Sequence, residues 1–149
     1  MKEIGLVYDR IRWEEKSLIE TSRKIGLNPK LVDSKEMYIN MLEDSAKIRT
    51  RFGEAVIQRC VSYFRGLHLT AALENMGLSV INSFNVSLVC GNKLFTTLAL
   101  IKAGIPIPKT FVAFTEEGVF KALENLGYPS VMKPVVGSWG RLVALIKDK

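Results

Sequence analysis

The residues with the clearest chemical potential lie in the stretch YPSVMKPVVGSWGRLVAL, where Lys133 is followed by Gly137 and Gly140. Glycines carry no Cβ, so their backbone N–H groups can approach a ligand closely, and successive N–H groups can surround an anion. A lysine beside them adds a compact positive charge. The stretch therefore has two interpretations: a phosphate-binding turn, or a plain structural turn, in which glycine is common.

Two widespread phosphate-binding motifs are excluded. The sequence contains no G-x-x-x-x-G-K-[ST] loop. Its first apolar run is followed by DRIR and not by G-x-G-x-x-G, so the dinucleotide fingerprint is missing as well.

The elements that position the turn are predicted by apolar periodicity and by glycine and proline stops. A helix from Asn92 to Ala103 ends before GIPIPKT, and a helix over 116–126 is capped by Thr115. We expect a strand at 110–114. Strands at 130–133 and 142–146 flank the turn, which predicts an antiparallel hairpin.

The first half of the sequence alternates short apolar strands with helices. Strands are expected at 4–8, 30–32, 55–58 and 79–81, with helices over 14–26 and 64–76. This order predicts an α/β fold with a parallel sheet covered by helices. Within 34–54, which is less regular, KEMYINMLEDS is expected to form a short helix and AKIRTRFGE a loop. We expect a Rossmann-like domain over 1–88 and the start of a second domain over 89–149.

Composition restricts the class of partner. The net charge of +6 favours an anionic partner, but there is no basic tail and aromatic residues do not alternate with Lys or Arg, so nucleic acid is not expected. No apolar run is long enough for a membrane span, and the N-terminus is predicted to be a strand, so a cytoplasmic protein is the default. Cys60 and Cys90 are expected to be buried thiols, and His68 a surface or core residue; zinc is not expected.

Four segments together resemble the ATP-grasp ligases: YDRIR, RCVSYFRGL, CGNKLFTTLALIKAGIPIPKT and GYPSVMKPVVGSWGRLVALIKD. Within that family they are most similar to the LysX branch of lysine biosynthesis, which belongs with the ribosomal-S6-type glutamate ligases. The resemblance covers nearly the whole chain and is poorest over 34–54.

The resemblance implies an N-terminal Rossmann-like pre-ATP-grasp domain followed by the first, incomplete α+β subdomain of an ATP-grasp fold. Such enzymes use ATP and Mg²⁺ to convert a carboxylate into an acyl phosphate, which an amine then attacks. In the LysX branch the carboxylate is the C-terminal glutamate of the acidic carrier protein LysW, and the amine is that of α-aminoadipate or, in some relatives, glutamate. A homo-oligomer is also implied.

The same resemblance assigns Lys93 and Lys133 to the ATP phosphates, and it assigns Gly137, Ser138, Trp139, Gly140 and Arg141 to the loop that closes over them. From the residues alone, Lys93 is favoured as a surface lysine at a helix start, and Trp139 is favoured as a packing aromatic. A second set follows strand ends, where open α/β sheets bind ligands, and could face substrate or carrier or be plain surface charge: Arg10, Arg12, Arg59, Ser62 and Arg65.

The magnesium ligands of the family, acidic residues and an asparagine, are expected beyond Lys149, so we expect these 149 residues to be an N-terminal portion that lacks ligase activity alone. Two other functions stay open. The chain could belong to a ribosomal-S6-type glutamate ligase acting on another protein or peptide, or it could be a non-catalytic module that binds an acidic partner.

Overall fold

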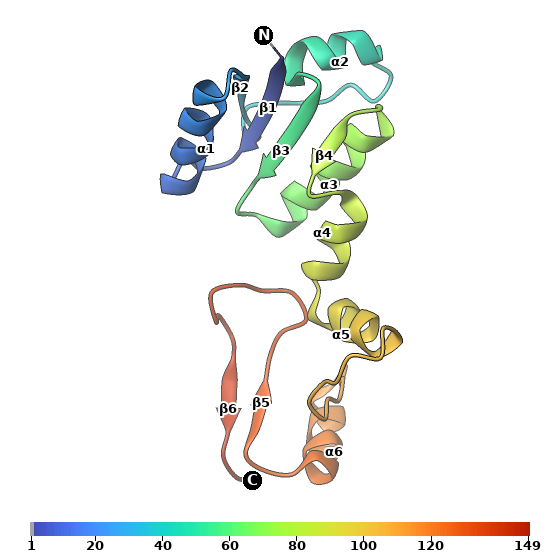
Figure 1. The fold of residues 1–149 in the computed structure, drawn as a ribbon. Coiled ribbons are helices and arrows are strands. Elements are labelled where there is room, and N and C mark those ends of the chain that lie inside the picture. The colour runs from blue at the N-terminus through green and yellow to red at the C-terminus, as the bar shows by residue number, and fades with distance from the viewer. Residues whose placement is uncertain (1) are drawn as a thin grey trace. The chain divides into compact units, whose positions relative to one another are not determined.

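The computed structural model describes residues 2–149, and the chain divides into two compact units, 1–87 and 88–149. The first unit contains a four-stranded, fully parallel sheet (Figure 1). Its strand order is β2-β1-β3-β4, with β1 at Glu3–Tyr8, β2 at Asn28–Asp33, β3 at Ala55–Arg59 and β4 at Ser79–Ile81. The predicted α/β fold with a parallel sheet is confirmed, and all four carboxyl ends of the strands lie at one edge.

Three helices connect these strands and cover the sheet: α1 at Trp13–Lys24, α2 at Ser45–Phe52 and α3 at Tyr63–Asn75. A fourth helix, α4 at Phe84–Cys90, follows the last strand of the sheet. Most buried apolar side chains form one cluster between α2, α3 and the sheet, including Phe52, Leu73 and Val56, which are fully buried. Ile19 of α1 is buried outside that cluster. This packing fixes the strand ends and the loops that follow them.

The predictions for 35–54 are wrong in both parts. The segment 46–54, expected to be a loop, lies largely in α2, where Asp44 caps the helix by accepting a hydrogen bond from the Ala46 N–H at 2.7 Å. Ile48 and Phe52 lie one helical turn apart and both are fully buried, which stabilises the helix. The segment 35–44, expected to be a helix, is a non-helical connection.

The second unit contains α5 at Lys93–Lys102, α6 at Glu116–Leu126 and an antiparallel pair, β5 at Ser130–Met132 and β6 at Ala144–Ile146. The helix and hairpin predictions are confirmed, as is the Thr115 cap, whose hydroxyl accepts a hydrogen bond from the Gly118 N–H at 3.1 Å. The strand expected at 110–114 is not present; this segment forms neither strand nor helix and has no strand partner within the described residues.

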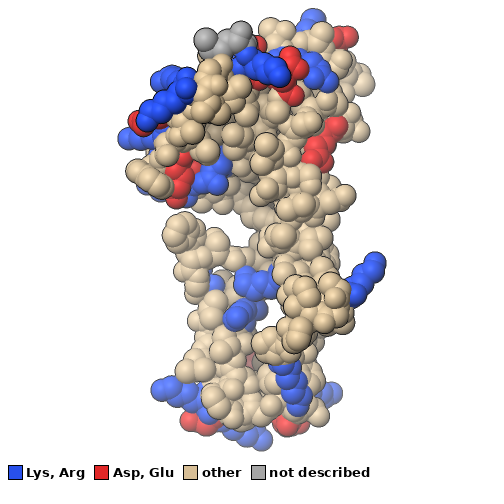
Figure 2. All heavy atoms as spheres, in the orientation of Figure 1, with Lys and Arg blue, Asp and Glu red and all other residues tan. Residues whose placement is uncertain are grey.

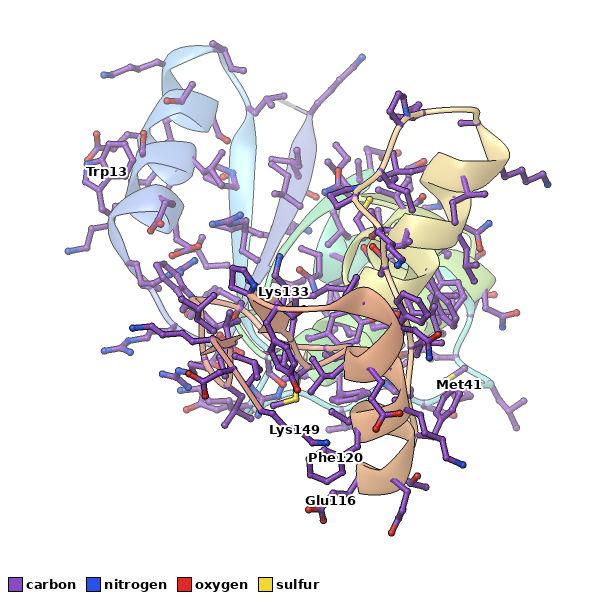
Figure 3. The ribbon with its side chains drawn as sticks, turned by 90° about the horizontal axis from the view of Figure 1, so that it is seen from below. Trp13, Met41, Glu116, Phe120, Lys133 and Lys149 are labelled. Atoms are coloured by element: carbon purple, nitrogen blue, oxygen red, sulfur yellow. The ribbon has the colours of Figure 1, made fainter. Side chains whose placement is uncertain are left out.

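Large apolar side chains are exposed in both units. Trp13 projects outward from α1 and Phe120 from α6, with 78% and 55% of their surface exposed (Figure 3). Within residues 2–149, no single helix has the length and apolar composition needed to cross a membrane, and α4 and α5 meet that requirement only when taken together across a bend.

Candidate functional site

Asp9 organises the carboxyl edge of the sheet in the first unit. It follows β1 directly, and its carboxylate accepts hydrogen bonds from the backbone N–H groups of Val61 at 2.9 Å and Ser62 at 3.0 Å. The Arg65 guanidinium donates a third bond at 2.9 Å, through Nη1. A single buried carboxylate therefore joins the end of β1 to the β3–α3 loop and to the first turn of α3.

These bonds determine the ionisation of Asp9. Burial by itself would raise its pKa, but the two backbone N–H groups and the Arg65 guanidinium stabilise the ionised form more strongly, so the pKa lies below its ordinary value. Asp9 is therefore a carboxylate at neutral pH, and it holds the Arg65 guanidinium in place.

Glu15 forms a second, fully buried charge centre at the start of α1. Arg12 donates to it from Nε at 3.1 Å and from Nη2 at 2.9 Å, and Arg59 donates from Nε at 3.0 Å. The Arg12 backbone N–H adds a bond at 2.9 Å, in the manner of a helix capping box. The Arg12 hydrogen bonds are the main reason that the pKa of Glu15 falls to about 2, against the opposing effect of burial.

Three arginines of the predicted second set are therefore held by buried carboxylates: Arg12, Arg59 and Arg65. Their side chains remain 26%, 34% and 42% exposed. Arg59 donates only from Nε, and its terminal nitrogens have no partner in the part of the chain that the structure describes. This edge thus presents oriented N–H donors to solvent, an arrangement that suits carboxylate or phosphate groups.

The other two members of that set differ from these arginines. Ser62 is the N-cap of α3 and accepts a 3.4 Å hydrogen bond from the Arg65 N–H, so its hydroxyl serves the helix end. Arg10 is exposed and forms no ion pair within residues 2–149. On the face of the first unit that Figure 2 shows, basic and acidic side chains are interspersed, so this face is not uniformly basic.

Sequence reasoning missed Asp9 and Glu15, the two carboxylates that orient the arginines. Both had a signal. Asp9 directly follows a strand, and Glu15 stands three residues after Arg12, which is the capping-box spacing. Their partners were not predictable from that spacing, because Val61, Ser62 and Arg59 lie far away in the chain.

In the second unit, Lys93 anchors the predicted loop. Its backbone N–H donates to the Val135 carbonyl at 2.8 Å, and its Nζ donates to the Gly137 carbonyl at 2.9 Å. Asn92 caps α5 by accepting from the Phe95 N–H at 3.1 Å. Lys93 is thus no unattached surface lysine, because it joins the start of a helix to a loop 44 residues later in the chain.

Lys133 follows β5, is exposed, and has no hydrogen-bond or ion-pair partner in residues 2–149; Figure 3 shows its position at the start of the β5–β6 connection. The connection contains Ser138 and Arg141, joined by a 3.3 Å bond from the Arg141 N–H to the Ser138 carbonyl. Gly140 has a φ of 68°, a conformation that favours glycine.

Trp139 does not pack as the sequence suggested. It is 79% exposed and has a φ of 60°, so the interpretation as a packing aromatic is wrong for the described residues. Lys133, the exposed turn and the Lys93 anchor together form a basic loop that could contact a phosphate group.

The cysteine prediction is also wrong in part. Cys90 is exposed and Cys60 only half-buried. Burial raises the pKa of the Cys60 thiol, which donates to Ser34 Oγ at 3.4 Å. His68 is a surface residue, as one of the two expectations had it. Within residues 2–149, no group of three or more His, Cys, Asp or Glu side chains is arranged to hold a metal ion.

The fold described above is also found in ATP-grasp proteins. The structure matches a RimK-domain ATP-grasp protein from Sphaerobacter thermophilus with a TM-score of 0.81 and 30% identity, covering 99% of this chain and 55% of that one. The chain belongs to the family described as the LysX preATP-grasp domain, which residues 4–89 match. The resemblance found in the motifs is thereby confirmed.

Named relatives extend the similarity across both units. The α-aminoadipate–LysW ligase LysX of Sulfurisphaera tokodaii is 40% identical over 146 residues, which is 98% of this chain and 51% of that protein. The glutamate–LysW ligase ArgX of Sulfolobus acidocaldarius is 35% identical over 147 residues, 97% of this chain and 50% of that protein. The chain spans about half the length of the curated relatives that it matches.

Proposed function

We propose that this chain forms part of an ATP-dependent carbon–nitrogen ligase that joins an amino acid to the C-terminal glutamate of the acidic carrier protein LysW. The observation that carries the proposal is the 40% identity to an α-aminoadipate–LysW ligase, which continues from the parallel sheet through the lysine-anchored turn. ATP would supply the phosphoryl group that activates the carboxylate.

In this proposal the second unit binds the ATP phosphates. Lys133 is an exposed cation with no hydrogen-bond or ion-pair partner within residues 2–149, and the connection of Gly137, Ser138, Trp139, Gly140 and Arg141 lies beside it in the chain. The Lys93 ammonium group has three N–H donors. One donates to the Gly137 carbonyl, and the other two are available to phosphate oxygens. Phosphoryl transfer depends on positioning and charge neutralisation, which lysines and backbone N–H groups provide.

The first unit would bind carboxylates of the carrier or substrate. The fixed guanidinium groups of Arg12, Arg59 and Arg65, together with Arg10 and Ser62, lie at the strand ends where open α/β sheets bind ligands. Because Asp9 and Glu15 orient three of these arginines in advance, a carboxylate would meet donors that need little reordering.

The amino acid would be α-aminoadipate or glutamate. Relatives named for either one match this chain at comparable identity, 40% for the first and 38% for the second in the same organism. We propose Mg²⁺ as the companion of ATP; within residues 2–149, no group of three or more His, Cys, Asp or Glu side chains could hold it. We also propose a cytoplasmic homo-oligomer with no nucleic-acid or membrane partner.

A second candidate is a ribosomal-S6-type glutamate ligase that acts on another protein or peptide. The RimK-domain structure, at 30% identity over nearly the whole chain, favours it. A competition experiment distinguishes the two candidate functions. The carrier ligase is supported if the chain binds LysW and a peptide with the LysW C-terminus displaces it. The second candidate is supported if the chain binds an unrelated glutamate-ending protein more tightly than LysW.

Calorimetric titration with ATP tests the phosphate site. Lys133→Ala should weaken ATP binding by about tenfold, the expected loss for one direct charged contact. Lys147→Ala is the matched control, because it removes the same charge from another exposed lysine of the second unit. Equal binding by the two variants would remove Lys133 from the proposed site.

The alternative of a non-catalytic module that binds an acidic partner gives a different result. Such a module would bind an acidic peptide in a salt-sensitive manner with no response to ATP. A ligase predicts that ATP and the carrier peptide change each other's affinity. Calorimetry with the peptide, with and without ATP, measures this directly.

A further inference from the structure

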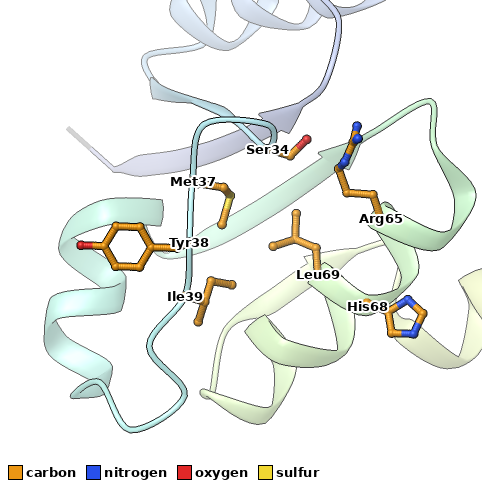
Figure 4. Close-up of a pocket in the computed structure, with 7 residues that line it drawn as sticks. All are labelled: Ser34, Met37, Tyr38, Ile39, Arg65, His68 and Leu69. Carbon is orange, nitrogen blue, oxygen red and sulfur yellow. The ribbon is translucent and has the colours of Figure 1, made fainter.

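The first unit contains a small pocket, which shares Arg65 with the proposed carboxylate-binding edge. Its volume is about 310 Å³, and it lies between the connection that follows β2 and the first turns of α3 (Figure 4). Ligand pockets begin at roughly this size, so it suits a small molecule and not a nucleotide or a peptide.

Apolar side chains form most of the pocket wall. Met37 and Ile39 point from the connection toward Leu69 of α3, while Tyr38 between them points the opposite way (Figure 4). This alternation is that of an extended chain. It brings the two apolar side chains against the core cluster and leaves Tyr38 80% exposed.

Two polar groups lie together at one end of the pocket, Ser34 and Arg65 (Figure 4). Ser34 Oγ accepts a hydrogen bond from the Cys60 thiol at 3.4 Å, so the hydroxyl hydrogen of Ser34 is available to donate to a ligand. Arg65 donates to Asp9 through Nη1 alone, so its Nε and Nη2 have no partner within the described residues. Since Asp9 also accepts two backbone N–H bonds, the Arg65 charge is only partly compensated.

We propose that this pocket binds a small monocarboxylate with a branched aliphatic tail. The carboxylate would accept hydrogen bonds from Arg65 and Ser34, and the tail would lie along Met37, Ile39 and Leu69. Amino acids with a second carboxylate and an ammonium group, such as the proposed substrates, would place charge against these apolar walls and are disfavoured. The pocket therefore favours a different ligand from the proposed substrates, although Arg65 belongs both to the pocket and to the proposed carboxylate-binding edge.

Isocaproate is the probe, and nitrogen-15 amide spectra of the whole chain are the measurement. Saturable shifts should be confined to the amides of 34–39, 60–62 and 65–69. Isocaproamide, which has the same shape without the charge, should bind at least about tenfold more weakly, as expected when a charged hydrogen bond is lost. Glutamate should cause no saturable shift of the amides of 37–39, which belong to the apolar wall and not to the proposed carboxylate-binding edge. Absence of shifts with isocaproate, shifts elsewhere only, or equal binding of the amide would overturn the proposal.

A matched pair of variants tests the location. Met37→Glu places a negative charge on the pocket wall and should abolish isocaproate binding by repelling its carboxylate. Met37→Gln has nearly the same shape without the charge and should keep binding within about threefold. Equal losses in the two variants would contradict a carboxylate at this position. Dispersed amide spectra of both variants would establish that they fold, and the comparison of isocaproate with its amide uses the unaltered chain.

This test is independent of the proposed ligase. ATP contacts are assigned to the second unit, so a chain that binds isocaproate and not ATP would support the pocket and refute the ligase. The reverse result would refute the pocket alone.

Discussion

Replacing Glu15 by glutamine tests the charge centre that orients Arg12 and Arg59. Glutamine has nearly the size and shape of a protonated glutamate, so the variant mimics the side chain without its charge. The pKa of Glu15 is about 2 in the folded chain, against an ordinary value of 4.5. This difference of about 2.5 units corresponds to about 3 kcal/mol of folding free energy at neutral pH.

The sign of the pH dependence follows from the lowered pKa. The contribution of Glu15 is fully present above its ordinary pKa and is lost as the pH falls through 4.5 toward 2. About 1.4 kcal/mol should remain at pH 3. The difference in free energy of unfolding between the unaltered chain and Glu15→Gln should therefore shrink by about half between pH 7 and pH 3.

Urea denaturation followed by circular dichroism, at several pH values, gives this difference directly. Glu14→Gln is the control, because Glu14 is the neighbouring carboxylate, lies 3.7 Å from Arg12 Nε and is 42% exposed. Its removal should cost less than about 0.5 kcal/mol. A Glu15→Gln effect as small as that of the control, or one that does not change with pH, would refute the reasoning.

Four further substitutions test the fold. Gly53→Ala should cost more than about 2 kcal/mol, because Gly53 has a φ of 84° and a Cβ there would lie 2.7 Å from the Glu3 carbonyl oxygen. Gly26→Ala, with a φ of 80° and open space, should cost only about 1 kcal/mol, and urea titration of both variants compares them. Phe52→Ala should lower the free energy of unfolding by about 4 kcal/mol, because the ring is fully buried; a loss below 1 kcal/mol would contradict the core assignment. Asn92→Ala should cost about 1 kcal/mol in the second unit, measured by amide hydrogen exchange of α5.

The sheet could be predicted where apolar runs are short and bounded by stops. The strand at Ser79–Ile81 has the predicted bounds, and α3 begins one residue earlier than expected and ends before Gly77. Gly77 has a φ of 82°, which explains why the helix cannot continue regularly through it. Local chemistry is sufficient in such segments because the stop signals and the apolar period agree.

The segment 35–54 was mispredicted because local signals compete there. The helix signal over 45–52 was present, with Asp44 as a cap and the Ile48–Phe52 spacing, but it was short because only these two side chains of the helix are buried. In the preceding connection, the Asn40 side chain accepts from the Leu42 N–H at 3.1 Å, a bond that favours a turn over a helix.

In the candidate sites, too, some features could be predicted from the sequence and others could not. Lys133 and its glycine turn were visible in the sequence, and their role at the ATP phosphates stays a prediction. The pairing of Lys93 with the Gly137 carbonyl was not visible, because it joins residues 44 positions apart. Spacing along a chain cannot report such a contact unless the fold is already known.

By itself, the sequence determined the α/β order of elements, the hairpin around the glycine turn, and the membership of the family through four short motifs. Only the tertiary structure decided which charges are paired. Asp9 meets Val61, Ser62 and Arg65 across 52 to 56 residues, because β1 and β3 are adjacent in the parallel sheet and their ends share one edge. A net charge of +6 does not distinguish an arginine held by a buried carboxylate from one in open solvent. That distinction depends on burial and distance, which arise only when segments remote in sequence pack together.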